Sequence, residues 1–398
     1  MPETSIAIVG GCGHVGLPLG IAFAHAGAHV TLVDTDAARV KTVLAGRMPF
    51  LERGADDALP AALATGRLHA VTAPDAIADA IAEAEVVVVT IGTPVDEFLD
   101  PAVRAFDRAI DRVLEHMRAG QLFVLRSTVF PGVTDRLARR VRERGLAIDV
   151  AYCPERIAQG FALDELYRLP QIVAGTSPAA GTRAGALFQP FGVPLVPLPP
   201  IEAELAKLFS NAYRYITFAI SNQFYLIAQR HGADFERVHR AVTTDYPRLA
   251  GFARAGFAAG PCLVKDTMQL AAFNHNAFAI GHAAMMINEG LPSTLVEMAK
   301  ERHDLTQKTA AILGMAFKGN SDDERSSLAY KLRKVLTLEC RRVLCTDPYI
   351  ADPDFVPLET ALKEADIVFV GACHDVYRDL VIDKPLIDVF GFVRRAGA

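Results

Sequence analysis

A cysteine that could act as a nucleophile stands in the stretch AGPCLVKDT, residues 259–267. Cys262 follows a Gly-Pro pair and precedes the charged pair Lys265 and Asp266. A thiolate can trap an aldehyde as a thiohemiacetal, and loss of hydride then leaves a thioester that water hydrolyses. Free cysteines are also among the most buried residues of proteins. The stretch alone therefore leaves two interpretations open, a packed core thiol and a catalytic nucleophile.

A dinucleotide-binding signature lies near the start of the chain. In IAIVGGCGHVG, Gly11, Gly13 and Gly16 form the pattern G-x-G-x-x-G between an apolar run and a helical pattern, and Asp34 closes the next apolar run. Such glycines let the backbone approach a pyrophosphate, and an acidic residue about 20 positions later accepts hydrogen bonds from a ribose. A 2′-phosphate would meet a like charge at Asp34, so the pattern predicts NAD rather than NADP. The alternative is that the glycines serve only close packing.

Two threonines follow later apolar runs, Thr93 in VVVVTIGTPVDE and Thr128 in VLRSTVFPGVT. Ligands of parallel sheets bind at the carboxyl ends of the strands. We therefore expect Thr93 and Thr128 to line the nicotinamide-ribose side of the cofactor site. The alternative is that each threonine only caps the helix or turn that follows it.

Further residues of suitable type lie on a strand end and on one helix. Glu155 follows an apolar run in AYCPERIAQG, and Lys207 and Asn211 are four residues apart in AELAKLFSNAYRY, which places them on one helix face. An amine and an amide together can stabilise a developing oxyanion, and a carboxylate such as Glu155 or Asp266 can position or activate water. A solvated lysine and a salt bridge at a strand end are the structural alternatives. Spacing alone does not bring these segments together in space.

Composition narrows the class of protein. The chain has 398 residues, a formal net charge of −5 and no block of Lys and Arg, so we expect neither nucleic acid nor a membrane as a partner. We expect no secretory signal, and we find no apolar run of membrane-spanning length. None of the six cysteines forms Cys-x-x-Cys, and no Cys/His cluster has zinc spacing. We therefore predict a cytoplasmic protein with reduced thiols and no metal.

The elements that must position these residues alternate along the chain. Apolar runs and helical patterns alternate up to the Pro-rich segment VPLVPLPP, no strand pattern is found from about 201 to 300, and the alternation returns after Thr306. We predict an α/β protein, with two Rossmann-like doubly wound parallel-sheet domains joined by a central all-helical region. The predicted domains are 1–199, 200–302 and 303–398. The long apolar helix of the middle region is typical of subunit pairing as well as of a core.

Eight ordered motifs, which span nearly the whole chain, resemble those of the nucleotide-sugar 6-dehydrogenases. This family includes UDP-glucose, UDP-N-acetylmannosamine and GDP-mannose dehydrogenases. The motifs are GGCGHVGLPLG, TIGTPV, STVFPGVT, CPERIAQG, AELAKLFSNAYRY, GPCLVKD, GMAFKGNSDDERSS and LIDVFG. The resemblance implies oxidation of a sugar C6 alcohol to a carboxylate with reduction of two NAD, and a homodimer through the central helices.

The resemblance also implies a role for individual residues. It makes Cys262 the thiol of the covalent intermediate, Lys207 with Asn211 the oxyanion-stabilising pair, and Asp266 with Thr128 the pair that holds a catalytic water. It makes Glu155 the general acid/base of thioester hydrolysis. The expected NAD contacts are Gly11, Gly13, His14, Val15, Gly16, Asp34, Thr93, Thr128 and Arg325. The expected contacts of the UDP-sugar are Glu155, Arg156, Lys207, Asn211, Arg248, Gly256, Phe257, Phe317 and Lys318.

The sequence departs from the family in two places, and the sugar is open. Val264 stands where many members have proline, and the segment from Arg248 to Cys262 is shorter than in animal UDP-glucose dehydrogenases. CPERIAQG and KLFSNAYRYITFAISNQFY resemble the bacterial UDP-N-acetylmannosamine branch, with UDP-glucose as the alternative sugar nucleotide. A one-step hydroxyacid dehydrogenase of the 6-phosphogluconate type would leave GPCLVKD unexplained. A non-catalytic binding protein would leave unexplained why all the catalytic residue types are present.

Overall fold

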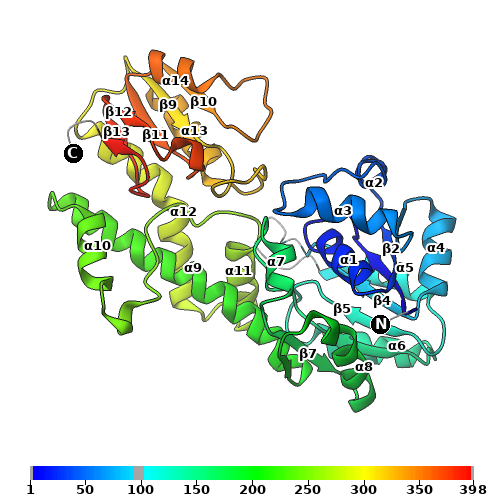
Figure 1. Ribbon diagram of the computed structural model, residues 1–398. Helices are drawn as coiled ribbons and strands as arrows, with labels where there is room; N and C mark the ends of the chain where they lie inside the picture. The colour runs from blue at the N-terminus through cyan, green and yellow to red at the C-terminus, as the bar shows by residue number, and fades with distance from the viewer. Residues whose placement is uncertain (1–2, 94, 96–102, 396–398) are drawn as a thin grey trace. The chain divides into compact units, whose positions relative to one another are not determined.

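The computed structural model of the chain describes residues 3–93, 95 and 103–395 and divides into two compact units (Figure 1). The units are Met1–Phe209 and Ser210–Ala398. The division falls inside one long helix, α9 (Pro200–Arg230). Because the division cuts a continuous helix, α9 contributes residues to both units.

The first unit is built on one sheet of strands β1–β8. The strands are β1 (Ser5–Val9), β2 (His29–Val33), β3 (Leu68–Val71), β4 (Val86–Val89), β5 (Leu122–Leu125), β6 (Asp149–Tyr152), β7 (Gln171–Gly175) and β8 (Leu195–Pro197). Their order across the sheet is β3-β2-β1-β4-β5-β6-β7-β8. All neighbours pair in parallel except β6 and β7, which pair antiparallel. The order reverses beside β1, between β1 and β4, which is where ligands bind in sheets of this kind.

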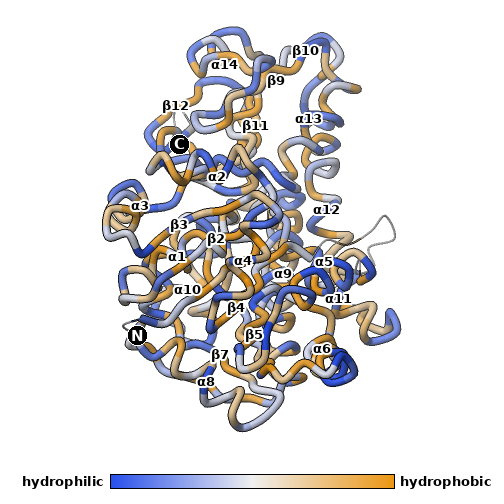
Figure 2. Tube along the Cα trace, turned by 90° about the vertical axis from the view of Figure 1, so that its right-hand side faces the viewer, coloured by the Kyte–Doolittle hydropathy of each residue, from blue (hydrophilic) through white to orange (hydrophobic). Residues whose placement is uncertain are grey.

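Helices cover both faces of this sheet. They are α1 (Gly16–His25), α2 (Ala37–Leu44), α3 (Ala55–Ala64), α4 (Pro74–Glu83), α5 (Val103–His116), α6 (Val133–Glu143), α7 (Ala162–Leu166) and α8 (Pro178–Phe188), with a short 3-10 turn η1 (Gln189–Phe191). Successive strand residues enter two separate cores: Ile6 and Ile8 pack with α1, whereas Ala7 packs with α5 and α6. Since both faces are buried, the strands are continuous apolar runs rather than alternating ones. Polar residues lie outside, and α6 is among the most hydrophilic segments in Figure 2.

The second unit combines helices with a smaller sheet. After α9 come α10 (Phe235–Thr243), η2 (Pro247–Leu249), α11 (Leu263–Phe273), α12 (Ala279–Lys300), β9 (Thr309–Leu313), α13 (Leu328–Glu339), β10 (Arg342–Thr346), α14 (Leu358–Glu364), β11 (Ile367–Val370), η3 (Asp375–Tyr377), β12 (Val381–Ile382), β13 (Leu386–Ile387) and β14 (Arg394–Arg395). The sheet has the order β10-β9-β11-β13 with parallel neighbours, and β12 pairs separately with β14. Leu291 and Leu295 of α12 pack with Ala310 and Ile312 of β9 in one core.

The predicted fold class is confirmed, with parallel sheets in the N- and C-terminal parts and a helical region between them. Within the described residues no strand lies between 201 and 300, as the sequence predicts. The Pro-rich segment differs from its interpretation as a mere boundary, because its residues Leu195–Pro197 form the edge strand β8. Proline lacks an N–H and is tolerated on an edge strand, so the segment can pair on one side only. The domain boundaries at 199 and 302 stay predictions.

The N-terminal end of α9 is tied to the first unit by a buried carboxylate. Glu204 is fully buried and accepts hydrogen bonds from the backbone N–H of Gly132 (2.6 Å) and from the N–H and hydroxyl of Thr134 (2.8 and 2.6 Å). These donors belong to the first turn of α6, whose N-cap is Gly132 and therefore has no side chain to satisfy them. Glu204 thus supplies the cap of α6 from another helix. Among the described residues, no helix is long and apolar enough to cross a membrane.

Replacement of this cap tests how α9 is attached. We expect Glu204→Ala to lower the free energy of unfolding by about 2–4 kcal/mol, because buried donors lose a charged acceptor. Glu202→Ala, at an exposed position of the same helical turn, serves as the control and changes the free energy by less than about 1 kcal/mol. Urea unfolding of the wild type and of the two variants measures both changes in the free energy of unfolding. Equal midpoints for Glu204→Ala and the wild type would contradict this role.

Candidate active site

The loop between β1 and α1 has the shape that a pyrophosphate needs. A Cβ on Gly11 would lie 2.6 Å from the carbonyl oxygen of Ile8, and one on Gly16 would lie 2.6 Å from that of Gly10. At Gly13 the nearest atom, the carbonyl oxygen of Gly10, would be 3.4 Å away, so a Cβ would make only an ordinary van der Waals contact there. The helix begins at Gly16 with Val15 as its N-cap. The loop therefore places backbone N–H groups and the positive end of a helix at one point, as anion binding requires.

Asp34 is held beside this loop by the backbone. Its two carboxylate oxygens accept hydrogen bonds from the N–H of Cys12 (3.0 Å) and of Asp36 (3.1 Å). Each oxygen retains a lone pair for a ribose hydroxyl. Burial, with a further contribution from Asp34, raises the pKa of the Cys12 thiol to about 12, so Cys12 is an inert packing residue of the loop. The residues present fit an NAD cofactor, with the glycine loop on the pyrophosphate and Asp34 on the adenosine ribose.

Other predicted cofactor residues lie around the same sheet edge. The His14 ring packs on Phe50, with ring centroids 4.0 Å apart. The Thr93 hydroxyl donates a hydrogen bond of 2.6 Å to the carbonyl oxygen of Thr128. The segments that follow β4 and β5 are therefore in direct contact, as expected for two strands that are neighbours in the sheet.

Glu155 lies in a buried ion pair. One carboxylate oxygen accepts bonds from both the Nε (2.8 Å) and an Nη atom of Arg126, and the other accepts the N–H groups of Arg156 (2.7 Å) and Ile157 (3.0 Å). Arg126 is itself almost fully buried and also donates to the Cys153 carbonyl (3.0 Å). Together these four hydrogen bonds fix the orientation of the Glu155 carboxylate. Arg126 was missed in the sequence, although it follows β5 directly at the strand end where ligands bind.

Arg156 is predicted to contact substrate and is tethered within the first unit. Its guanidinium donates a hydrogen bond to the carbonyl oxygen of Pro170, and its side chain is only partly buried. The following loop is held by a second buried carboxylate, since Glu52 accepts the N–H of Gly160 at 2.9 Å. The segment CPERIAQG is thus a fixed loop rather than a flexible one.

A second polar cluster connects α9 with α11. The Asn211 side-chain amide donates a bond of 2.5 Å to Asp266, and Lys265 forms an ion pair with the other carboxylate oxygen. Asp266 is fully buried, while Lys207 lies one helical turn before Asn211 on α9 and is also largely buried. Asn211 and Asp266, two predicted site residues that lie 55 positions apart in the chain, are therefore in direct contact. The structure thus gives Lys265 a role, since its positive charge balances the buried negative charge of Asp266.

Cys262 is exposed and occupies the N-cap position of α11. Its carbonyl accepts the N–H of Asp266 at 2.9 Å, which closes the first turn of the helix. The N-terminus of a helix favours a thiolate. Burial, by contrast, raises the pKa of Cys153 to about 12 and of Cys340 and Cys345 to about 11. The interpretation of Cys262 as a buried core thiol is therefore wrong.

Residues of the C-terminal part of the second unit pack against the segment 253–262 that leads to Cys262, called the cysteine loop below. A Cβ on Gly260 would lie 2.6 Å from a ring carbon of Phe317, and its N–H donates to the carbonyl oxygen of Ser326 at 3.2 Å. Gly260 also has a φ of +100°, so no other residue fits this close approach without strain. The predicted residues Phe317 and Cys262 thus belong to one cluster. The Lys318 ammonium lies 5.8 Å from the centre of the Phe317 ring.

Arg325 faces the same cluster. Its guanidinium makes a two-point contact with Asp323, through Nε (2.8 Å) and Nη2 (2.6 Å). The hydrogen bond to Asp323 is the largest cause of a raised pKa of Arg325, and the charge of Cys262 adds to it. A permanent positive charge therefore acts on Cys262, whereas the resemblance implied only a contact with the cofactor.

A buried histidine–aspartate pair fixes the loop that carries Phe317. The Nδ1 atom of His374 accepts a hydrogen bond from the N–H of Asn320 (3.0 Å), so the ring proton is on Nε2 and is donated to Asp347 (3.0 Å). Asp347 also accepts a hydrogen bond from the N–H of Met315 (2.7 Å). Burial acts to raise the pKa of Asp347, but these hydrogen bonds outweigh it and hold that pKa below its usual value. Asp347 and His374 follow β10 and β11, so the rule about strand ends would have found them.

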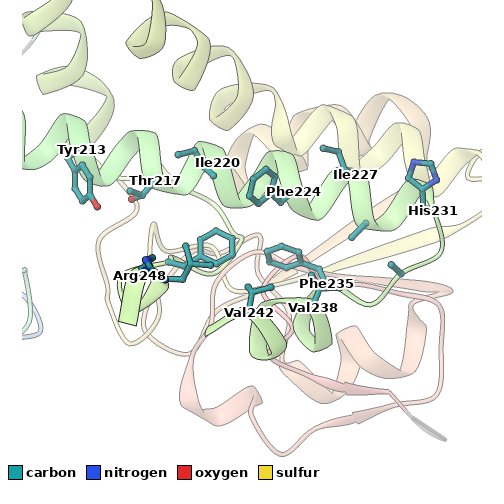
Figure 3. Close-up of a pocket in the computed structure, with 15 residues that line it drawn as sticks. Tyr213, Thr217, Ile220, Phe224, Ile227, His231, Phe235, Val238, Val242 and Arg248 are labelled. Carbon is teal, nitrogen blue, oxygen red and sulfur yellow. The ribbon is translucent and has the colours of Figure 1, made fainter. Parts of the chain in front are cut away.

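Arg248 lies elsewhere in the second unit. It borders a groove of about 670 Å³ between α9 and α10 (Figure 3). The charged group of its side chain lies 5.6 Å from the centre of the Tyr246 ring. One side of the groove is a stripe along α9, whose residues Figure 3 labels in succession along that helix, with Val238 and Val242 of α10 across from it. Its residues are Tyr213, Thr217, Ile220, Phe224, Ile227 and His231.

Apart from Arg248, the predicted site residues whose contacts are described above form two sets, one in each unit. In the first unit the structure places the glycine loop, Asp34, the Thr93–Thr128 contact and the Glu155–Arg126 pair on one sheet. In the second unit it joins Asn211 with Asp266, and Cys262 with Phe317 and Arg325. Among the described residues, no group of three or more His, Cys, Asp and Glu side chains could hold a metal ion.

Comparison with known proteins identifies the family. Three models of the UDP-glucose/GDP-mannose dehydrogenase family match in order: its NAD binding domain at 4–192, its central domain at 201–290 and its UDP binding domain at 311–395. The chain belongs to this family. Its N-terminal part is the NAD-binding domain of an oxidoreductase, and its C-terminal part is the UDP-binding domain.

The relatives of the dehydrogenase include UDP-N-acetyl-D-mannosamine dehydrogenases and UDP-glucose dehydrogenases. The UDP-N-acetyl-D-mannosamine dehydrogenase of Pyrococcus horikoshii is 30% identical over 94% of this chain and 90% of its own length. The UDP-glucose 6-dehydrogenase YwqF of Bacillus subtilis is 28% identical over 90% and 86%. A solved UDP-D-ManNAc dehydrogenase of Pyrococcus horikoshii aligns with a TM-score of 0.89 at 26% identity, over 98% of this chain and 96% of the other. The UDP-glucose dehydrogenase of Pyrobaculum islandicum aligns with a TM-score of 0.88 at 27% identity, over 98% and 95%.

Alkylation of the dehydrogenase tests the environment of Cys262. We expect iodoacetamide at neutral pH to modify Cys262 before the other cysteines, because it is exposed and lies at a helix N-terminus. Arg325→Ala should slow this modification about fivefold, since the thiolate loses a nearby positive charge. Arg237→Ala is the matched control, because Arg237 also pairs with an aspartate but is 78% exposed on another helix. Peptide mass spectrometry over time gives the rates; an unchanged rate in Arg325→Ala would contradict the assignment.

Proposed function

We propose that this dehydrogenase oxidises the C6 hydroxyl of a UDP-sugar to a carboxylate, with UDP-N-acetylmannosamine as the preferred sugar nucleotide. The observation that carries the proposal is the exposed Cys262 at the N-terminus of α11, in a chain with an NAD-binding and a UDP-binding domain. Oxidation of an alcohol to a carboxylate removes four electrons, so two NAD are reduced. A thiol is needed for the second step, since it holds the aldehyde until the next hydride leaves.

Each residue of the two sets then has a chemical task. NAD supplies the acceptor for hydride when it is bound. The Cys262 thiolate adds to the aldehyde carbon, and the new oxyanion is stabilised by the ammonium of Lys207 and the amide of Asn211. After the second hydride leaves, a water held by Asp266 and Thr128 adds to the thioester, the carbon–sulfur bond breaks and Cys262 returns as thiolate. Glu155, oriented by Arg126, takes the proton from that water.

Substrate contacts complete this proposal. Phe317 and Lys318 lie in the same cluster as Cys262, and the UDP-binding domain supplies the loop that carries them. Arg156, Arg248, Gly256 and Phe257 are also proposed to contact the sugar nucleotide. Two observations support the preference for an N-acetylhexosamine: the motif CPERIAQG, and relatives named UDP-N-acetyl-D-mannosamine dehydrogenase from several organisms. The alternative sugar nucleotide is UDP-glucose, after which other relatives are named.

Stoichiometry tests the reaction directly. Incubation with NAD and a panel of UDP- and GDP-sugars should yield two NADH per sugar consumed, for UDP-N-acetylmannosamine and not for GDP-sugars. Absorbance at the NADH band and chromatography of the product measure both quantities. Cys262→Ser should abolish turnover yet retain NAD binding, because an oxygen ester hydrolyses poorly. One NADH per sugar would indicate a simple alcohol dehydrogenase, and no turnover of any sugar would refute the proposal.

The proposed cytoplasmic enzyme is a homodimer that forms across α9. The stripe in the groove repeats at alternating steps of three and four residues, as in a helix that packs against another helix. Its large side chains are exposed in one chain: Tyr213 is 67% exposed, Phe224 50% and Ile227 47%. A long, regular apolar stripe on a single helix is suited to a copy of itself, since two-fold symmetry places the same stripe on both sides. Arg248 at the border of the groove would then lie close to the interface.

The dimer makes a separate prediction. Light scattering coupled to size exclusion should give twice the 42.9 kDa mass of one chain at micromolar concentration. Phe224→Asp should shift the protein toward the monomer, because it places a charge in the centre of the stripe. Leu338→Asp is the control, since Leu338 is 86% exposed on α13, outside the stripe. A monomeric wild-type protein would contradict the homodimer without bearing on the chemistry.

A further inference from the structure

The loop that leads to Cys262 has little regular structure of its own. Between η2, which ends at Leu249, and α11, which begins at Leu263, the chain forms turns, bends and irregular backbone without a helix or a strand. Its backbone must therefore find hydrogen-bond partners on other elements, because unpaired buried backbone groups are unfavourable. Residues 255–258 are buried, so water does not serve them.

The side chain of Asn222 on α9 supplies both a hydrogen-bond donor and an acceptor to this loop. Its Oδ1 accepts the N–H of Gly256 at 2.8 Å, and its Nδ2 donates to the carbonyl oxygen of Gly256 at 3.0 Å. The side-chain amide thus pairs with one residue of the loop as a neighbouring strand would. Asn222 has no exposed surface. An amide is required, because no other side chain of this size offers a donor and an acceptor in that arrangement.

A second asparagine fixes the orientation of the first. Asn288 of α12 is also fully buried; its Oδ1 accepts the remaining Nδ2 hydrogen of Asn222 at 2.9 Å, and its own Nδ2 donates to the Tyr215 carbonyl oxygen at 2.9 Å. Both amides therefore have one assignment only. The neighbouring Ser221 donates a bond of 2.6 Å to the carbonyl oxygen of Ala253. Two adjacent residues of α9 thus hold two points of the loop.

The opposite side of the loop is closed by aromatic rings. A Cβ on Gly256 would lie 2.5 Å from a ring carbon of Phe390, and the rings of Phe257 and Phe390 pack edge to face with centroids 5.7 Å apart. Gly256 has a φ of +152°, which favours glycine. The loop is therefore clamped between Asn222 and Phe390, four residues before Gly260 meets Phe317.

We propose that Asn222, oriented by Asn288, is a positioning residue that sets the path of residues 253–260 and thereby places both the predicted sugar contacts and Cys262. The inference rests on the proposed function, because it is that reaction which needs the thiol at the sugar C6 atom. Asn222 touches neither the substrate nor the cofactor domain in this assignment. Its loss should therefore act on the sugar nucleotide and not on NAD.

Hydrogen exchange and kinetics together test this inference. In Asn222→Ala we expect the peptide that covers 253–262 to exchange about tenfold faster, while peptides of α12 are unchanged. The catalytic constant over KM for the UDP-sugar that the wild type oxidises should fall about 100-fold, because small misplacements of reacting groups have effects of this size. KM for NAD should stay within about twofold of the wild type, since the loop belongs to the second unit. Asn274→Ala is the control, as Asn274 is exposed and bonds only locally to Ala277.

Asn222→Asp supplies a readout that a general loss of stability would not give. An ionised carboxylate keeps the bond from the Gly256 N–H but loses both donated bonds, and a protonated one regains one of them. The defect should therefore shrink as the pH falls in Asn222→Asp and not in Asn222→Ala, and this comparison also serves if the alanine variant folds poorly. Unchanged exchange of 253–262, or equal changes in KM for NAD and for the sugar, would overturn the inference. Absence of activity in the wild type would instead overturn the proposed function and leave the exchange result standing.

Discussion

The backbone of the cysteine loop is held by side chains and carbonyls of other elements, and the rest of the second unit is arranged around that constraint. Asn222 holds Gly256, Ser326 holds Gly260, and α11 begins directly after Cys262. A loop without internal hydrogen bonds would sample many conformations, and each would place the thiol differently. Anchors from α9 and from the C-terminal part remove this freedom. The same anchors explain why glycine stands at both close approaches, to Phe390 and to Phe317.

Charge is distributed so that one cysteine differs from the others. Burial raises the pKa of Cys153 and Cys345, which pack in the sheets, and the nearby charges of Arg126 and Arg333 offset only part of this effect. Cys262 instead combines exposure, a helix N-terminus and the charge of Arg325, which Asp323 holds in place. Two carboxylates of the site are buried together with a cation, Glu155 with Arg126 and Asp266 with Lys265. Burial of isolated charges would be strongly unfavourable, so these pairs must fold together.

The sequence predicted the elements better than the contacts between them. Apolar runs located the main strands, and the glycine pattern with Asp34 located the cofactor loop, because both signals are local. The contact of Asn211 with Asp266 could not be derived from spacing, since it joins residues 55 positions apart. Arg126, Asp347 and His374 were missed although each follows a strand, because their partners lie 27 to 29 positions away in the chain and spacing gives no signal of such pairs. Asn222 was missed for a different reason: an asparagine inside an apolar helix has no local pattern that reveals its partner.

The helix α9 carries the polar contacts of the site on one face and the proposed subunit contact on the other. Its buried face carries Glu204, Lys207, Asn211 and Asn222 in succession, at intervals of three, four and eleven residues. Each of these residues is close to a multiple of one helical turn from the next, so all project from one side. The exposed stripe that begins at Tyr213 lies about 200° around the helix from Asn211, on the opposite side. The polar contacts of the site and the proposed subunit contact therefore do not compete for surface. A change on one face should leave the other intact, which allows the anchoring of the loop and the association of chains to be altered separately.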